Sequence, residues 1–319
     1  MGLLGILLMK VVSYYNVVPN KNKSQEKFDI LTKFIQGVNA AGDTGIVHKG
    51  YDLQKCDVGM IQGWQHEVGK NAPHLQLRQR VMQRTANKRV CTADANLFLY
   101  ANKTNHPHHY LRYSFDGVFP NTGEYFDNNP NPKRWQQISK HLNISLEQPK
   151  LNGKNIVICL QRNQGWSMGK LPVVQWLENV ILEIKKYSDR KIVIRPHPGD
   201  KKAIIHYLPQ LMQKYKHNPS IKISSAGTPL EQDLQKAWAV VNHNSSSIVG
   251  PLIQGYPGFI TDSVKSQCAE VSHNGFSQLE NPQQFDRQQW LERISMLHWN
   301  FEELENGTAW RHMRQYVNS

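Results

Sequence analysis

The chain has 319 residues, of which 39% are apolar and 20% are charged. This length and composition exclude a disordered chain and leave room for two domains with buried cores. Lysine and arginine number 38 against 25 acidic residues. The resulting formal charge of +13 and pI near 9.5 favour anionic partners such as nucleotides, nucleic acids or a membrane surface.

The cysteines and the N-terminal residues bear on the compartment. The four cysteines lie far apart in the sequence, which is not the pattern of a disulfide framework or a zinc site. Residues 1–9 are mostly apolar, but this stretch is much shorter than the roughly 20 residues that span a bilayer. It also lacks a basic region before its apolar run. We expect a cytoplasmic protein with reduced thiols, in which this stretch leads into the first strand.

Strands and helices alternate through the first half of the chain, which predicts a parallel sheet with helices packed on it. Apolar periodicity and turn residues predict strands over 11–18, 45–47, 58–61 and 89–92, and helices over 24–38 and 73–85. From 93 to 149 asparagine, proline and histidine are frequent. We expect long loops there, at the edge of a domain.

A second and more regular alternation begins near Gly153. It predicts strands over 155–160, 191–195, 221–224 and 238–241, and helices over 171–186 and 201–216, with a short helix before the last strand. The tail from 282 to 317 has a helical pattern and carries three tryptophans. We therefore expect an α/β protein with domains over 1–150 and 151–319.

A polar loop follows the strand predicted at 238–241. A serine in this loop is expected to cap a helix that Gly255 ends. A helix N-terminus after a strand presents free N–H groups and a positive dipole end, and serine hydroxyls add further donors. The alternative is an ordinary serine-capped helix. The candidates for holding a phosphate are His243, Asn244, Ser245, Ser246 and Ser247.

Two other strands end in polar loops at the same expected edge of the sheet, where open α/β sheets bind ligands. Arg195 and His197 offer donors to a phosphate or a ribose after the strand at 191–195. Arg162, Asn163 and Gln164 follow the strand at 155–160. Each loop taken alone is explained by a surface turn, but their convergence predicts a nucleotide site.

The pair of motifs His197-Pro198 and Ser245-Ser246 resembles that of bacterial sialyltransferases and related capsule-type transferases of the GT-B fold. In those families the two motifs hold the nucleotide and phosphate of the sugar donor. The resemblance covers mainly residues 110 to 310. It implies two Rossmann-like domains facing a central cleft, with the acceptor on the first domain and the donor on the second. It also implies C-terminal helices that cross back to the first domain.

The resemblance further implies a direct displacement at the anomeric carbon of the donor. The general base of those families is a carboxylate in an acidic-acidic-Gly motif. Here Phe115-Asp116-Gly117 stands in the expected order, with Phe115 in place of the first acid. Asp116 would accept the acceptor's proton, while His197 and the serine loop stabilise the departing phosphate. The alternative for Asp116 is a turn residue before Gly117.

The acceptor is expected to be anionic, because residues 1–150 hold 19 lysines and arginines against 11 acids. On an extended helix at 73–85, Arg80, Arg84 and Lys88 would share one face, either as a solvated face or, with Arg112, as acceptor-binding residues. The sharpest hypothesis is modification of duplex DNA, as in phage DNA glycosyltransferases, with the target base extruded. A capsule or lipopolysaccharide transferase is the first alternative. A non-catalytic nucleic-acid-binding module is the second.

No metal and no cofactor beyond the nucleotide-sugar co-substrate is expected, because the sequence has no Asp-x-Asp motif. The segment Asn105–Tyr110 contains three histidines within four residues, which is a pattern that can bind zinc. It has neither a nearby cysteine nor a clear fourth ligand. A solvated or acceptor-binding loop is the preferred interpretation.

Overall fold

The computed structural model describes residues 8–19, 25–64, 71–100, 110–163, 165–169, 171–200, 203–225 and 227–318. The chain divides into two compact units, of which the first comprises residues 1–96, 105–141 and 292–319 and the second comprises 97–104 and 142–291. The chain passes from the first unit to the second between residues 141 and 142, before the boundary expected at 150. The 3-10 turn Leu97–Tyr100 belongs to the second unit, because it packs against α8 (Val249–Ile253).

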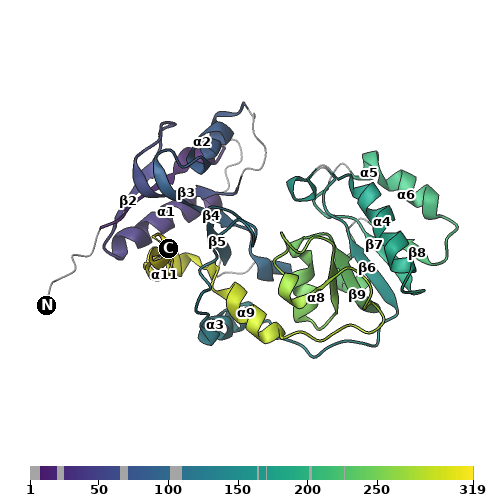
Figure 1. The fold of residues 1–319 in the computed structure, drawn as a ribbon. Coiled ribbons are helices and arrows are strands. Elements are labelled where there is room, and N and C mark those ends of the chain that lie inside the picture. The colour runs from purple at the N-terminus through teal and green to yellow at the C-terminus, as the bar shows by residue number, and fades with distance from the viewer. Residues whose placement is uncertain are drawn as a thin grey trace. The chain divides into compact units, whose positions relative to one another are not determined.

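A six-stranded sheet forms the centre of the first unit, in the order β12-β5-β4-β3-β1-β2 (Figure 1). β1 to β4 run parallel, whereas β5 is antiparallel to β4 and β12 is antiparallel to β5. The chain leaves β1 toward β2 on one side and continues into β3 on the other. The strands are β1 Lys10–Tyr14, β2 Thr44–His48, β3 Cys56–Gln62, β4 Asn87–Asp94, β5 Leu111–Phe115 and β12 His298–Trp299.

Helices bury apolar faces against this sheet. In α1 the buried residues recur with helical spacing and include Leu31, Phe34 and Val38, which join the core of the first unit. α2 begins at Pro73, where proline is tolerated because its missing N–H has no partner in the first turn. The helices of this unit are α1 Gln25–Ala40, α2 Pro73–Met82, α3 Pro132–Leu142, α10 Phe301–Glu305 and α11 Thr308–Met313, while α9 Arg287–Ser295 leads into it from the second unit.

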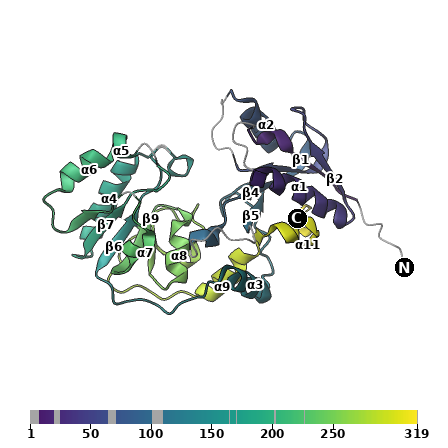
Figure 2. The same cartoon turned by 180° about the vertical axis from the view of Figure 1, so that it is seen from behind.

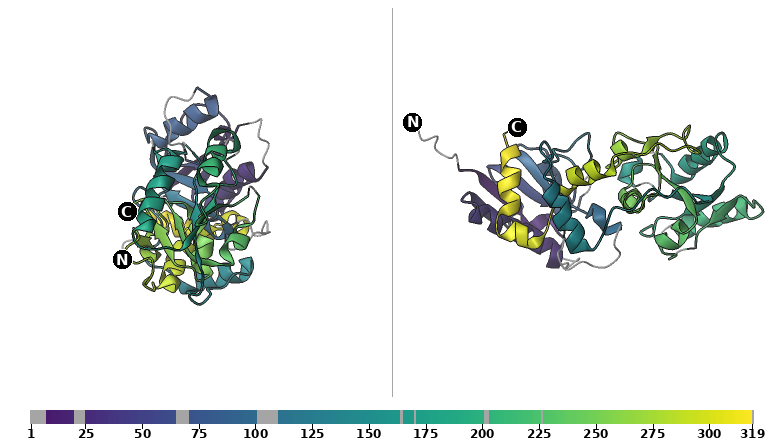
Figure 3. Two further views of the ribbon diagram at one scale, coloured as in Figure 1. Left: turned by 90° about the vertical axis from the view of Figure 1, so that its right-hand side faces the viewer. Right: turned by 90° about the horizontal axis from the view of Figure 1, so that it is seen from below.

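The C-terminal residues are fixed to the start of the first unit by Asp43. Its buried carboxylate accepts hydrogen bonds from the indole N–H of Trp310 at 2.7 Å, the Arg314 guanidinium at 2.6 Å and the Met9 backbone N–H at 2.9 Å. α10 and α11 pack against α1, and the yellow C-terminal segment lies along the purple one in Figures 2 and 3. The bonds from Trp310 and Arg314 thus hold the C-terminal segment in place, while the bond from Met9 fixes the carboxylate itself.

The second unit contains a fully parallel six-stranded sheet in the order β11-β10-β9-β6-β7-β8. Alternate residues of its strands, such as Ile156 and Ile158 in β6, share one face with the buried stripe of α4. β9 is buried over its whole length, as expected for the centre of a parallel sheet. The strands are β6 Asn155–Cys159, β7 Lys191–Arg195, β8 Ile221–Ile223, β9 Ala237–Asn242, β10 Gly258–Ile260 and β11 His273–Asn274.

The helices of the second unit follow the strands in turn. They are α4 Val173–Lys185, α5 Ala203–His206, α6 Leu208–Tyr215, α7 Leu230–Leu234 and α8 Val249–Ile253. The single helix expected over 201–216 is interrupted at Tyr207, because Pro209 lies in the first turn of α6 and cannot continue the hydrogen bonds of a preceding helix.

The expectation of long loops from 93 to 149 is wrong for two segments. β5 is missed by periodicity because Arg112 and Ser114 are buried polar residues within the strand. The sequence does contain a signal for α3, because Trp135, Ile138 and Leu142 are spaced as one buried helical face. The helical tail also contains β12, which adds an edge strand to the first sheet.

Each of the four cysteines is buried and takes part in no disulfide. Within the described ranges, no helix has the length and apolar character needed to cross a bilayer.

Candidate functional site

The second sheet has a switch point between β6 and β9. The chain proceeds from β6 to β7 and β8 on one side, and then returns to β9 on the other side of β6. Crevices that bind ligands in open α/β sheets form at such a point, beyond the carboxyl ends of the strands. The loops that begin at Gln161 and His243 leave the sheet there.

Gln161 and Asn244 join the two loops across this switch point. The Gln161 side-chain nitrogen donates to Asn244 Oδ1 at 2.9 Å, and the Asn244 backbone N–H donates to Gln161 Oε1 at 2.9 Å. The Asn244 amide also donates to the Ser167 carbonyl at 3.0 Å and to the Asp262 carboxylate at 2.9 Å. Asn244 is therefore a support for the loops, with its side-chain groups already engaged.

His243 is held in a similar way from the next strand. Its Nδ1 lies 2.8 Å from Thr261 Oγ1, which also accepts the indole N–H of Trp176 at 2.8 Å. Burial lowers the pKa of His243, although Asp262 acts in the opposite direction. The imidazole is thus neutral at physiological pH and oriented by β10 and α4.

The ring of His197 is held by its own loop. The Gly199 backbone N–H donates to His197 Nδ1 at 2.9 Å, so a neutral imidazole carries its proton on Nε2. Burial lowers the pKa of His197, and the charge of Arg162 lowers it further, while Asp200 opposes them. At neutral pH, His197 therefore offers an Nε2–H donor without a full positive charge.

Arg162 supplies the positive charge beside that histidine. A Cβ atom at Gly199 would lie 2.5 Å from Arg162 Nη2 and 3.1 Å from His197 Cε1, so the guanidinium passes directly over the glycine. The Arg162 side chain is exposed and makes no hydrogen bond or ion pair with the described residues. A free guanidinium next to a neutral imidazole donor suits a phosphate group.

The serine loop begins a short helical segment. Ser245 Oγ accepts the Ser247 N–H at 3.2 Å, which makes Ser245 the cap of the 3-10 turn Ser246–Ile248 that leads into α8. Gly255, with a φ of +91°, follows the end of α8 as expected. Ser245, Ser246 and Ser247 are all partly accessible at the carboxyl end of β9.

Of the three other residues expected to bind the sugar donor, two are engaged by the rest of the fold and one lies outside the described residues. Arg195 pairs with Asp233 at 2.8 Å, so its charge is already balanced. Asn163 accepts the Val173 N–H at the start of α4 through its side chain at 3.2 Å, and its backbone N–H donates to Asp200 at 3.0 Å. Gln164 lies outside the described residues, as do residues 105–109 of the histidine-rich segment.

Asp116 lies at the amino end of the parallel strands, because β5 runs antiparallel to β4. Its carboxylate contacts Arg89 at 2.6 Å and Arg84 at 3.0 Å, and it accepts the Val90 N–H at 2.8 Å. Its φ of +58° marks the tight turn into Gly117. This geometry supports the alternative of a turn residue better than the expected role as a base.

The carboxyl edge of the first sheet presents a different acid. β4 ends at Asp94, whose carboxylate accepts the Ala95 N–H at 2.8 Å and pairs with Arg112 from β5. The Asp94 side chain is 31% exposed, against 8% for Arg112. Sequence reasoning missed Asp94, although an acid directly after the buried run Val90–Ala93 was a readable signal.

The basic stripe expected on one helix face does not form. α2 ends at Met82, and Arg84 follows with a φ of +55°, so Arg84 and Lys88 lie beyond the helix. Arg80 donates to the Tyr51 carbonyl at 2.9 Å, and Lys88 pairs with Asp57 at 2.7 Å. With Arg112 at the opposite end of β4, the four candidates for acceptor binding are not brought together.

Among the described residues there is no group of three or more histidines, cysteines or acids placed to bind a metal ion. No protein family matches the sequence, and no curated protein matches it either.

The comparison with solved structures is informative at the level of fold. The KpsC β-Kdo 2,7 transferase of Thermosulfurimonas dismutans matches with a TM-score of 0.51 at 12% identity, over 94% of this chain and 99% of that one. The chain has a GT-B fold. The KpsC β-Kdo 2,4 transferase of the same organism matches with a TM-score of 0.49 at 13% identity, over 91% of this chain and 90% of that one. The match to the 2,7 transferase extends over most of both units of this chain, each of which has its own mostly parallel sheet.

Proposed function

We propose that the chain is a glycosyltransferase that moves a sugar from a nucleotide-sugar donor to a hydroxyl group of a capsule-type glycan. The observation that carries this proposal is a group of hydrogen-bond donors at the switch point of the second sheet. Arg162 and the Nε2–H of His197 offer a phosphate site after β6 and β7, and the serine loop offers hydroxyls after β9. The structural likeness to a KpsC transferase over almost the whole chain supports the same class.

The reaction forms a bond between the acceptor oxygen and the anomeric carbon and breaks the bond from that carbon to the donor phosphate. Arg162 and His197 stabilise the negative charge that develops on the departing phosphate. The hydrogen-bond donors around the phosphate need not move during the reaction. Gly199 orients His197, and the Gln161–Asn244 pair holds the loops in place.

The acceptor hydroxyl has to lose a proton during the transfer, and we assign Asp94 as the general base that takes this proton. Asp94 is supported by its place at the carboxyl edge of the first sheet and by its exposure. Its pairing with Arg112 fixes the orientation of the carboxylate. Asp116, at the other end of β4 and bound by two arginines, keeps the role of a turn residue in this scheme.

Thermal unfolding with UDP, CMP, GDP and ADP tests the donor site. A nucleotide that binds only the folded chain adds about 2.7 kcal/mol of stability at a hundredfold excess over its Kd, which raises the midpoint. We expect a shift with one nucleotide that His197→Ala abolishes and that the control His217→Ala keeps, since His217 is an exposed residue of the same unit. If none of the four nucleotides shifts the midpoint, the non-catalytic alternative is favoured instead.

A further inference from the structure

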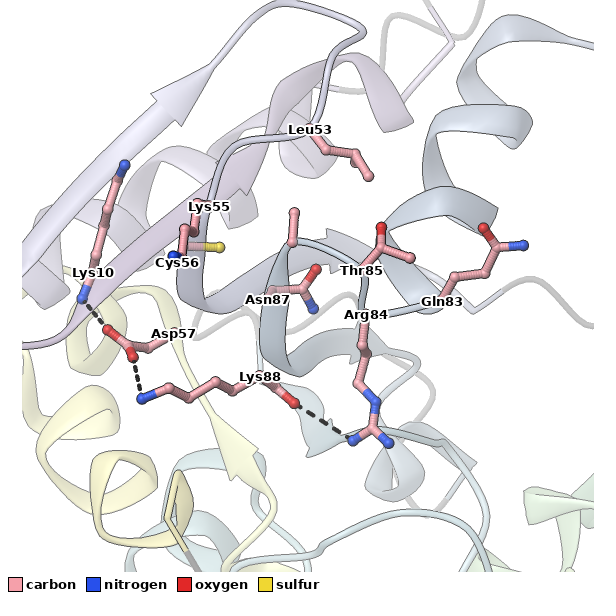
Figure 4. A pocket seen from close by; sticks show the side chains of 11 residues that line it. Lys10, Leu53, Lys55, Cys56, Asp57, Gln83, Arg84, Thr85, Asn87 and Lys88 are labelled. Carbon is pink, nitrogen blue, oxygen red and sulfur yellow. Dashed lines mark hydrogen bonds and ion pairs between the residues drawn. The ribbon is translucent and has the colours of Figure 1, made fainter.

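The first unit contains a hollow of about 1280 Å³ that the proposed reaction does not use (Figure 4). Lys10, Cys56 and Asn87 line it, and they are the first residues of β1, β3 and β4. Asn87 and Asp94 are the two ends of β4, which places them roughly 23 Å apart in an extended strand. The hollow is therefore separate from the edge that carries Asp94.

The charges lining this hollow are mostly positive. Lys88 pairs with Asp57 at 2.7 Å, and Figure 4 shows the Asp57 carboxylate between that ammonium and the backbone nitrogen of Lys10. Arg84 is balanced by Asp116. The side chains of Lys10 and Lys55 make no ion pair with any described residue, so two cations remain uncompensated at the hollow.

The rest of the lining is uncharged and combines the apolar side chains of Leu53 and Ala86 with polar ones. Gln83 and Thr85 are exposed there, and each carries a hydrogen-bonding side chain. Asn87 is 95% buried, and within the described structure its carboxamide oxygen has no hydrogen-bond partner. The volume exceeds the roughly 300–1000 Å³ usual for small-ligand sites. A ligand with an anionic group and many hydroxyls matches this lining better than a single small anion.

We propose that this hollow binds an anionic oligosaccharide, with a carboxylate or phosphate group held by Lys10 and Lys55 and with sugar hydroxyls bound by the neutral side chains. The choice of a saccharide rests on the proposed function. A transferase that extends a glycan can contact that glycan a second time, away from the end that reacts. Duplex DNA fits less well, since tracking its backbone takes a row of free cations and two of the four here are already paired.

Calorimetric titration of the full chain with hexagalacturonate tests this site, with maltohexaose as the neutral probe and a 12-base-pair duplex as the nucleic-acid probe. The variant is Lys10→Gln/Lys55→Gln. The matched control is Lys133→Gln/Lys140→Gln, which removes the same charge from exposed positions of α3. We expect hexagalacturonate to bind, maltohexaose to bind at least about tenfold more weakly, and the first variant to lose about tenfold in affinity while the control changes less than about twofold.

Calorimetric titration and the unfolding midpoint, measured on the same samples, distinguish a failure of this inference from a failure of the proposed function. Hexagalacturonate binding without any nucleotide-induced shift in the unfolding midpoint supports the saccharide site and removes the transferase proposal. A nucleotide shift without hexagalacturonate binding overturns the saccharide site alone. Equal losses in the two double variants, or tighter binding of the DNA duplex that Lys10→Gln/Lys55→Gln abolishes, also overturn it.

Discussion

Gln161 and Asn244 exchange two hydrogen bonds, each of 2.9 Å, between the loops that leave the carboxyl ends of β6 and β9. The two residues are far apart in the sequence and adjacent at the switch point of the second sheet. The Gln161 carboxamide nitrogen donates to the Asn244 side chain, its oxygen accepts the Asn244 backbone N–H, and both residues are buried. The pair fixes the loops whose other residues, Arg162 and Ser245 to Ser247, remain accessible to a ligand.

Replacing Asn244 with alanine is expected to lower the free energy of unfolding by about 1–3 kcal/mol, because Gln161 loses one hydrogen-bond acceptor and the Ser167 carbonyl and Asp262 lose a donor. Nucleotide affinity should fall as well, since only the bond from the backbone N–H of residue 244 then joins the loops. Urea unfolding followed by tryptophan fluorescence measures the first effect, and titration with the nucleotide that stabilises the chain measures the second. Gln213→Ala, at an exposed position of α6, should change stability by less than about 0.5 kcal/mol. An unchanged midpoint for Asn244→Ala would contradict the supporting role.

Gly199→Ala is expected to weaken nucleotide binding about fivefold to tenfold with little loss of stability. The new Cβ would lie 2.5 Å from Arg162 Nη2, and the flexible end of that side chain can move away. The moved guanidinium then loses its place beside His197. Arg162→Ala should give a similar loss, and the double variant should be no weaker than either single one, because both act through the same group. Additive losses in the double variant would show that Gly199 acts independently of Arg162.

Asp94→Asn is expected to reduce sugar transfer by a factor of about 100 or more and to leave nucleotide binding intact. Asp116→Asn should instead lower the free energy of unfolding by about 1–3 kcal/mol, because Arg84 and Arg89 lose their shared partner. Its turnover per folded molecule should be kept. Rates with the stabilising nucleotide's sugar conjugate, normalised to the folded fraction, distinguish the two. Loss of turnover in a fully folded Asp116→Asn protein, with Asp94→Asn active, would reverse the assignment.

The stability of the chain should fall as the pH drops below about 6.5. Burial lowers the pKa of His298 to about 3, although its hydrogen bond to the Ile294 carbonyl opposes this, and Arg112 and Arg134 lower it further. The folded chain thus stays unprotonated at His298 while the unfolded chain takes up a proton, so acid favours unfolding between pH 6.5 and 3. This group contributes a slope of up to about 1.4 kcal/mol per pH unit.

Replacing His298 with asparagine, whose amide can keep the hydrogen bond to Ile294, should flatten that pH dependence by up to one proton. Urea unfolding at a series of pH values from 7 to 4 measures the slope. His217→Asn removes an exposed histidine and serves as the control for the substitution. A slope that is equal in the His298→Asn variant and the unmodified chain would mean that His298 takes up its proton equally in the folded and unfolded states.

The order and type of most elements could be predicted because their signals are local. The run Ile156–Ile158 is apolar without interruption, as a strand buried on both faces requires, and Gly255 ends α8 because glycine accepts a positive φ. The polar loops after β6, β7 and β9 converge for a reason that the sequence also contains, since parallel strands bring their carboxyl ends to one edge.

What the tertiary structure decided depends on strand direction and on partners distant in the sequence. Residues 111–115 read the same in a parallel or an antiparallel strand, and only their pairing with β4 places Asp116 at the amino edge and leaves Asp94 at the carboxyl edge. Arg195 and Asn163 are polar residues at the expected edge, but Asp233, Asp200 and the start of α4 engage them. A side chain is free for a ligand only if no other part of the chain satisfies it first, and that is a property of three-dimensional packing.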